Sequence, residues 1–176
     1  MAQTATRNRE ATTLAEERQR KYLVRADEIA EQAVTASHPW NPNSEFTGTR
    51  LAVLSGLTRI GVSLMKVPPG KESFVYHSQE REEEWIYVIS GRGVAEIEDE
   101  EFEVGSGDFM GFPTGIAHHL RNPYEEDLVY LVGGENVDIE VANFPRLGRR
   151  IIRKGEEVQV YRTSDATDFG ELTEES

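Results

Sequence analysis

The chain has 176 residues, of which 38% are hydrophobic and 29% are charged, a composition typical of one folded domain with a short appendage. Its formal net charge of -13 at pH 7 repels phosphate backbones and anionic lipid, so we expect no nucleic-acid partner and no membrane partner. No apolar stretch reaches the length needed to cross a bilayer, and the absence of cysteine excludes disulfides and thiolate metal ligands.

Residues 1–45 predict a helix followed by a linker. Thr13 and Glu16 form a capping-box pattern, and apolar residues then recur at helical spacing. We expect the helix to run from about residue 13 to residue 36 and to end before His38, which precedes a proline. The start of the chain lacks the apolar segment of a secretory signal, so a cytoplasmic location is expected.

Residues 46–162 have the pattern of an all-β domain, in which short strands alternate with glycine, proline and acidic turns. Strands this short and evenly spaced are typical of a sandwich or a closed barrel. Residues 163–176 are expected to form an acidic tail with a frayed end. The expected strands cover residues 51–54, 58–67, 73–79, 84–89, 93–98, 101–104, 108–112, 118–121, 127–133 and 138–141, with a last pair around Gly155.

Two stretches of this β region carry residues suited to metal binding. In the first, His77 and Gln79 lie two positions apart on an expected strand, so both side chains point to the same face and can bind one ion. Glu84 begins the next strand and can reach that face across a short connection. In the second stretch, His118 begins another strand directly after a proline-glycine turn.

Both stretches resemble the two signature motifs of the cupin superfamily. The second stretch matches the motif at Gly107, Pro113, Gly115, His118 and Asn122. The first matches at His77, Glu84 and Gly91, but Gln79 stands where the family usually has another histidine, and Gly70 lies one residue off the common spacing. The segments HPWNPNS, PPG and EEEWIYVISG are similar to a bacterial group of small cupins that is often labelled by analogy with sugar-phosphate isomerases.

The resemblance implies an all-β cupin double-stranded β-helix barrel, here preceded by an N-terminal α-helical extension. It also implies the metal ligands His77, Glu84 and His118, with Gln79 as a fourth that departs from the family pattern. Two histidines and one carboxylate suit a divalent Fe, Zn or Mn ion, and a glutamine can add a neutral amide oxygen. The alternative is a cupin barrel whose pocket no longer binds a metal.

Three functions are compatible with a cupin barrel that carries these residues. The first is a metal-dependent enzyme acting on a small polar molecule, by oxygenase-type or isomerase-type chemistry. An isomerase needs a general base, and only Glu84 or a pocket water is available, whereas oxidation needs fewer acid and base groups. The second is a non-catalytic module that binds a small molecule or a metal, and the third is a structural or storage role.

Other residues are given structural interpretations. His119 neighbours a ligand on a strand and should face away from the barrel interior. Trp85 and Tyr87 should point outward and, with the N-terminal helix, predict a homodimer or a larger assembly. Glu82 is interpreted as part of a solvated acidic turn. The basic cluster is interpreted as a solvated strand face; the alternatives are a site for an anionic ligand or for an acidic neighbouring subunit. The cluster consists of Arg146, Arg149, Arg150, Arg153 and Lys154.

Overall fold

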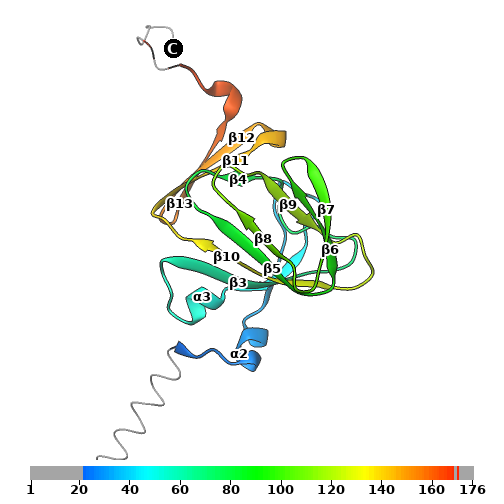
Figure 1. Cartoon of the computed structure of the whole chain (residues 1–176). Coiled ribbons are helices and arrows are strands. Elements are labelled where there is room, and N and C mark those ends of the chain that lie inside the picture. Colours follow the sequence, from blue (N-terminus) through cyan, green and yellow to red (C-terminus); the bar gives the residue numbers. More distant parts are fainter. Residues whose placement is uncertain (1–21, 169, 171–176) are drawn as a thin grey trace, which may run out of the picture.

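A mostly β architecture is seen in the computed structural model, which describes residues 22–168 and 170 (Figure 1). The described residues form three sheets in which all paired strands are antiparallel. The largest sheet has the order β1-β2-β3-β10-β5-β8. Its strands are β1 (Val34–Ala36), β2 (Phe46–Thr49), β3 (Ile60–Val67), β10 (Leu128–Glu135), β5 (Glu84–Ser90) and β8 (Phe109–Phe112).

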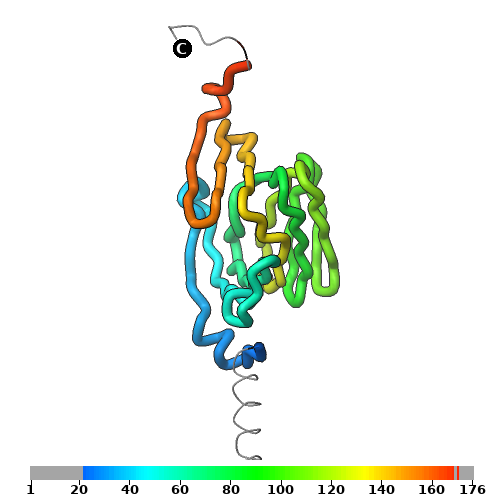
Figure 2. The backbone as a smooth tube through the Cα atoms, turned by 90° about the vertical axis from the view of Figure 1, so that its left-hand side faces the viewer, coloured from blue at the N-terminus to red at the C-terminus, as the bar shows by residue number. Residues whose placement is uncertain are grey.

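Two smaller sheets complete the barrel. One has the order β13-β12-β11-β4 and contains β13 (Glu157–Arg162), β12 (Arg149–Lys154), β11 (Ile139–Phe144) and β4 (Ser78–Gln79). The other has the order β7-β6-β9 and contains β7 (Glu100–Gly105), β6 (Arg92–Ile97) and β9 (His118–Arg121). Figure 2 shows the β12–β13 and β6–β7 hairpins on opposite sides of the molecule.

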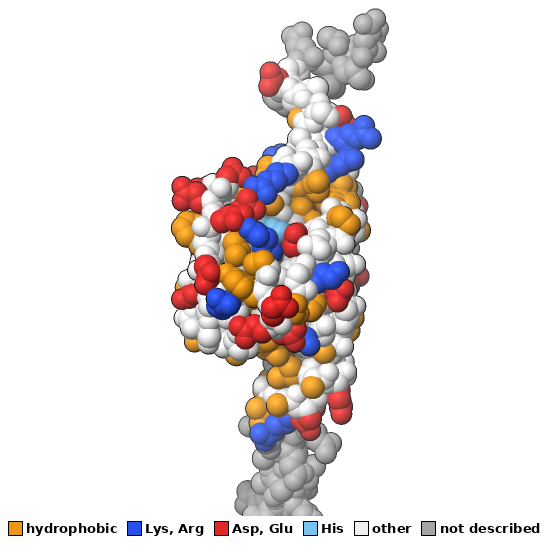
Figure 3. All heavy atoms as spheres, turned by 90° about the vertical axis from the view of Figure 1, so that its right-hand side faces the viewer, with side chains coloured by type: hydrophobic (Ala, Val, Ile, Leu, Met, Phe, Trp, Pro, Cys, Tyr) orange, Lys and Arg blue, Asp and Glu red, His pale blue; other side chains and the backbone are white. Residues whose placement is uncertain are grey.

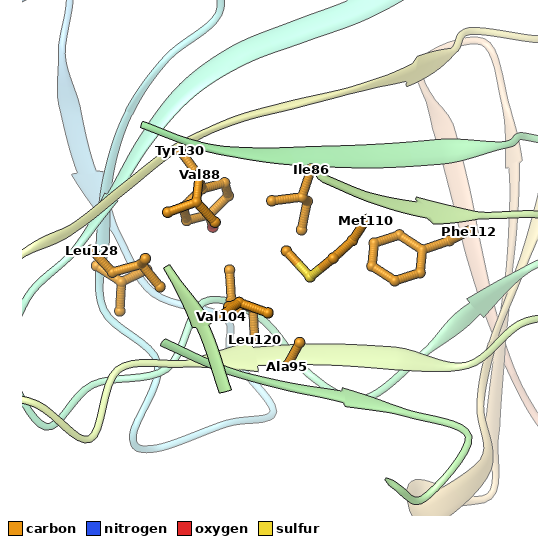
Figure 4. Close-up of a cluster of buried hydrophobic side chains, with 10 residues drawn as sticks. Ile86, Val88, Ala95, Val104, Met110, Phe112, Leu120, Leu128 and Tyr130 are labelled. Atoms are coloured by element: carbon orange, nitrogen blue, oxygen red, sulfur yellow. The ribbon is translucent and has the colours of Figure 1, made fainter. Parts of the chain in front are cut away.

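The hydrophobic core lies between the β3-β10-β5-β8 part of the large sheet and the β6–β9 pair (Figure 4). Alternate residues of each strand point inward, as a period of two requires. Val88 on β5 and Leu128 on β10 are fully buried, and Leu120 on β9 meets them from the opposite sheet. The alternation that predicted these strands therefore also identifies the face that they bury.

The turn between β5 and β6 depends on Gly91. Its φ of 78° is a left-handed conformation that favours glycine. A Cβ atom at this position would overlap the backbone carbonyl of Asp127, on the connection that leads into β10. Gly91 thus allows two backbone segments to approach each other closely.

The strand predicted at residues 51–54 is wrong, because this segment is the short helix α3 (Leu51–Leu54). A short apolar run has no periodicity that separates a strand from a buried helical turn. The Ser55 hydroxyl donates to the Leu51 carbonyl at 2.8 Å, and Ala52 is buried. Packing of α3 onto β3 decides the helical conformation.

The helix predicted over residues 13–36 is shorter than expected. Residues 1–21 lie outside the part of the chain that the structure describes, so the correction concerns residues 22–36. Helix α2 spans only Ala26–Glu31, where the Glu28 carboxylate accepts a hydrogen bond from the Arg25 backbone at 2.9 Å. Residues 34–36 instead form β1, because their pairing with β2 supplies hydrogen bonds to a β-branched segment. None of the helices that the structure describes is both long enough and apolar enough to cross a membrane.

The strand expected over residues 73–79 is regular only at β4. Before it, the chain runs beside β9 through isolated bridges at Glu72 and His77. The Ser73 hydroxyl and backbone amide both donate to the Leu120 carbonyl, at 2.8 and 2.9 Å. Two 3-10 turns, η1 (Pro145–Leu147) and η2 (Thr163–Asp165), flank the β12–β13 hairpin, and η2 begins the predicted acidic tail.

Candidate metal centre

His77, Glu84 and His118 converge at one end of the barrel from three different elements. His77 immediately precedes β4, Glu84 begins β5 and His118 begins β9. One ligand atom from each residue lies within 4.8 Å of the other two, and His118 Nε2 is 3.1 Å from Glu84 Oε1. The backbones of His77 and His118 exchange two hydrogen bonds, at 3.1 and 2.8 Å, which hold the two imidazoles side by side.

The hydrogen bonds of both imidazoles leave their Nε2 atoms available. His77 Nδ1 lies 2.8 Å from the Val75 carbonyl, and His118 Nδ1 lies 3.1 Å from the Ile116 carbonyl. Because a carbonyl only accepts, each Nδ1 carries the proton, and the Nε2 of a neutral ring is an acceptor. The backbone carbonyls thus select the tautomer that a metal needs.

The contact between His118 Nε2 and Glu84 Oε1 then joins two acceptors, which only a proton or a cation between them satisfies. Burial, followed by the neighbouring His118, lowers the pKa of His77 to about 4, so this ring is neutral at pH 7. The side chain of His118 is 5% exposed, and its ring stacks on Phe112 with centroids 3.8 Å apart. The donor set therefore fits a divalent cation bound by two nitrogens and one carboxylate oxygen.

Gln79 borders the same cavity as these three residues. It lies on β4, opposite Ala142 of β11, and its backbone carbonyl accepts a hydrogen bond from Gly115 at 2.7 Å. This bond ties β4 to the proline-glycine turn that leads into His118. The role of Gln79 as a fourth metal ligand stays a prediction.

The turn between Gln79 and Glu84 is held by two buried carboxylates. Glu140 accepts hydrogen bonds from the backbone amides of Glu80 and Arg81, at 2.9 and 3.3 Å. Glu82, interpreted above as solvated, is instead 8% exposed and bonds to Arg153 and to the Val137 amide. An acidic run gives no local signal that one of its members is buried, because the partners come from distant strands.

A cavity of about 290 Å³ extends from the candidate metal centre into the barrel. Most of its wall is apolar and includes Met65, Ile86, Ala95, Met110, Leu120 and Val132. Neutral polar side chains are contributed by Ser63, Ser73, Gln79 and Tyr130.

Tyr130 is a cavity residue that sequence reasoning missed. Burial raises the pKa of its phenol, and the nearby Glu84 carboxylate acts in the same direction, while a hydrogen bond with Ser73 opposes them. The phenol therefore stays protonated at neutral pH. On the sequence Tyr130 is one apolar residue of an alternating strand, and only the tertiary structure places it beside Glu84.

The remaining predicted residues lie away from the three ligand atoms. The ring of His119 is directed to Glu72, with Nε2 3.5 Å from the carboxylate, although the residue also borders the cavity. Tyr87 is 42% exposed on the outer face of β5, and Trp85 stacks on Phe109 with centroids 6.2 Å apart. Both aromatic residues thus point outward, as predicted.

Members of the basic cluster form ion pairs and hydrogen bonds with other residues of the barrel domain. Arg146 bonds to Glu96 and Asp99 and lies over the ring of Tyr76, 3.9 Å from its centroid. Arg150 donates to the Asn143 side chain at 2.7 Å. Figure 3 shows the side of the molecule over β6, β7 and β9, where acidic and basic side chains are intermixed around apolar ones.

The fold and these residues agree with comparisons to known proteins. A family model for the cupin domain matches residues 63–134. The fold resembles the crystal structure of a "putative sugar phosphate isomerase" from Acidithiobacillus ferrooxidans, with 34% identity and a TM-score of 0.80 over 86% of this chain and 99% of that chain. The chain belongs to the cupin family.

Two further similarities are more distant. A sugar phosphate isomerase from the cupin superfamily of Silicibacter pomeroyi is 21% identical, with a TM-score of 0.70 over 83% of this chain and 96% of that chain, and shares the fold. An uncharacterized protein of Methanocaldococcus jannaschii is 34% identical over 56 residues, which are 32% of this chain and 44% of that protein. The chain spans less than half the length of the curated relatives that it matches.

Proposed function

We propose that this cupin is a metal-dependent enzyme that acts on a small polar molecule bound next to His77, Glu84 and His118. The observation that carries the proposal is the convergence of three ligand atoms within 4.8 Å of one another at the wall of a cavity. A divalent ion held there would supply Lewis-acid catalysis, for isomerase-type or oxygenase-type chemistry. Gln79 is proposed as a fourth, neutral ligand.

The protein residues then have distinct roles. His77, Glu84 and His118 would hold the ion, and the carbonyls of Val75 and Ile116 keep the two rings in the required tautomer. The apolar cavity wall excludes water around the bound molecule, which strengthens electrostatic interactions there. The Tyr130 phenol can donate a hydrogen bond to an oxygen atom of the ligand.

A non-catalytic binding module is the second candidate, and one observation favours it. Once the three ligands are assigned to the ion, the described cavity lining offers only Tyr130 and His119 as further titratable groups. Tyr130 stays protonated, whereas burial lowers the pKa of His119, whose Nε2 lies 3.5 Å from the Glu72 carboxylate and has no hydrogen-bond partner among the described residues. Isomerisation would therefore depend on His119 or a water molecule as its base, whereas oxidation or simple binding needs no base.

Elemental analysis of protein purified without added metal, followed by calorimetric titration of the metal-free protein with Fe(II), Zn(II) and Mn(II), tests the proposal. We expect stoichiometric binding that His118→Ala reduces by at least about a hundredfold, because an imidazole ligand is lost. His119→Ala is the matched control, since it removes a neighbouring histidine of β9 and should leave metal affinity unchanged. Equal affinity in wild type and His118→Ala would show that the ligand set is wrong.

Oxygen consumption separates the two reaction types. Uptake of oxygen by the iron-loaded protein in the presence of a small organic substrate supports the oxygenase type. Activity with zinc or manganese and without oxygen uptake supports the isomerase type. Stable metal binding without turnover supports the binding module.

A further inference from the structure

The wall of the metal cavity carries no cation of its own. Among the described residues that line it, none is lysine or arginine, and the one carboxylate is Glu84. The polar groups beyond the candidate ligands are the hydroxyls of Ser63, Ser73 and Tyr130 and the imidazole of His119, whose pKa is lowered by burial. These groups bind neutral oxygen or nitrogen atoms and cannot neutralise an anion.

Two guanidinium groups of β12 and the turn before it are committed elsewhere. Arg146 is paired with Glu96 and Asp99, and Arg153 is paired with the buried Glu82. Arg50 borders a second cavity that shares Ser63 and Met65 with the first, but it does not line the metal cavity. A phosphate bound deep in the metal cavity would have no guanidinium to bind it bidentately.

Charge then decides which ligands the cavity accepts. A divalent ion with the Glu84 carboxylate leaves one net positive charge, which compensates one negative donor group on a ligand. A phosphate ester adds a charge of about -1.5 to -2 at neutral pH. Burial of that charge without a partner is strongly unfavourable. A ligand that binds the ion through one head group therefore cannot also place a phosphate against the apolar wall.

We infer that the cavity takes a small ligand with one oxygen-donor head group and an uncharged body, and that it rejects phosphorylated molecules. The inference rests on the proposed metal site and adds the substrate class to it. A cavity of this kind would not accept the sugar phosphates named in the descriptions of two similar structures. The apolar side chains of Met65, Ile86 and Val132 contact the body of the ligand, and the hydroxyls of Ser63 and Tyr130 bind its neutral polar atoms.

Two hydroxamic acids with the same metal-binding head group test this inference. Glycolohydroxamic acid is uncharged beyond its head group, and phosphoglycolohydroxamic acid is its phosphate ester. Calorimetry and the visible spectrum of Co(II)-loaded protein report their binding. We expect the phosphorylated compound to bind at least about tenfold more weakly, a difference of about 1.4 kcal/mol. Inorganic phosphate should leave the Co(II) spectrum unchanged.

A charge-insertion variant provides the second measurement. Ser63→Lys adds a cation to the cavity wall and should improve binding of the phosphorylated compound relative to its parent by at least about tenfold. Val62→Lys, on the opposite face of β3, is the control and should leave the ratio of the two affinities unchanged. Unaltered metal affinity in both variants shows that the candidate metal centre is intact.

The outcomes distinguish failure of the ligand-class inference from failure of the proposed metal site. Wild-type protein that responds equally to both compounds, or to neither, or that prefers the phosphorylated one, overturns the inference about the ligand class. A preference for the phosphorylated compound that Arg50→Ala removes would place its phosphate in the second cavity. Failure of the metal titration itself would instead remove the proposed function on which the inference rests.

Discussion

If Gln79 is the fourth ligand, it offers the candidate metal centre a neutral amide oxygen, where an imidazole would be a stronger donor for late transition metals. We predict that Gln79→His raises affinity for Ni(II) or Cu(II) by about tenfold or more, while affinity for Mn(II) changes less. Calorimetric titration of both proteins with each metal measures this. Identical affinities would mean that position 79 does not reach the ion, and His77, Glu84 and His118 would then form a bare facial triad.

Buried histidines predict that the metal-free protein loses stability in acid. Burial lowers the pKa values of His38, His77 and His119, so the unfolded chain binds more protons than the folded chain below pH 6.5. The free energy of unfolding must then fall as the pH falls from 6.5 through about 4, the pKa of His77. His77 alone accounts for a loss of about 2 kcal/mol between about pH 7.5 and about pH 5.

Urea unfolding of metal-free protein at these two pH values measures the loss. His77→Gln removes the titrating group and should flatten the dependence by about the same amount. If the variant retained the full dependence on pH, His77 would not be the buried neutral group described above.

At the scale of elements, the site depends on how turns hold the ends of strands. The Glu140 carboxylate on β11 accepts hydrogen bonds from backbone amides of the turn before Glu84. The Gly115 amide donates a hydrogen bond to the Gln79 carbonyl. Glu82 joins the same turn to Arg153 on β12. Residues of β11 and β12 thus support the candidate ligand Glu84 on β5 without lining the cavity themselves.

The β5–β6 turn gives the clearest prediction about stability. Gly91 and Gly56 both have φ near 75°, at 78° and 75°, but only Gly91 faces another backbone segment. Replacement by alanine at Gly56 should cost about 1 kcal/mol for the left-handed conformation alone. At Gly91 the overlap with the Asp127 carbonyl should raise the loss to about 3 kcal/mol or more. Thermal or urea unfolding compares the two variants, and equal losses would contradict the close approach at Gly91.

At the scale of the whole molecule, the outer face of β5 and β8 is exposed and aromatic. Phe109 is 65% exposed and Tyr87 is 42% exposed, beside the Trp85 ring that covers Gly133. Exposed aromatic groups of this kind favour association, so a homodimer stays our prediction.

Sedimentation velocity at micromolar concentration measures the assembly. Wild type should sediment as a dimer, and Phe109→Glu should shift it toward monomer, because the carboxylate opposes burial of the aromatic face. Val158→Glu changes another exposed apolar residue, 55% exposed on β13, and should leave the dimer intact. A monomeric wild-type protein would contradict the prediction.

Local patterns in the chain predicted an all-β sandwich or barrel, and the resemblance of two motifs to the cupin signatures implied the cupin fold. Alternation of apolar and polar residues marks strands such as β5 and β9, because side chains on a strand point to opposite faces in turn. The prediction of an all-β cupin fold is confirmed. The candidate ligands were also visible in the sequence, since their residue types and spacing are properties of short segments.

Contacts between distant segments decided the rest. Residues 51–54 became a helix and residues 34–36 a strand because of what packs beside them, which short apolar runs do not encode. Burial of Glu82 and Glu140 depends on partners many residues away, and so does the position of Tyr130 beside Glu84. The tautomers of His77 and His118 were likewise settled by carbonyls that only the folded backbone brings within hydrogen-bonding distance.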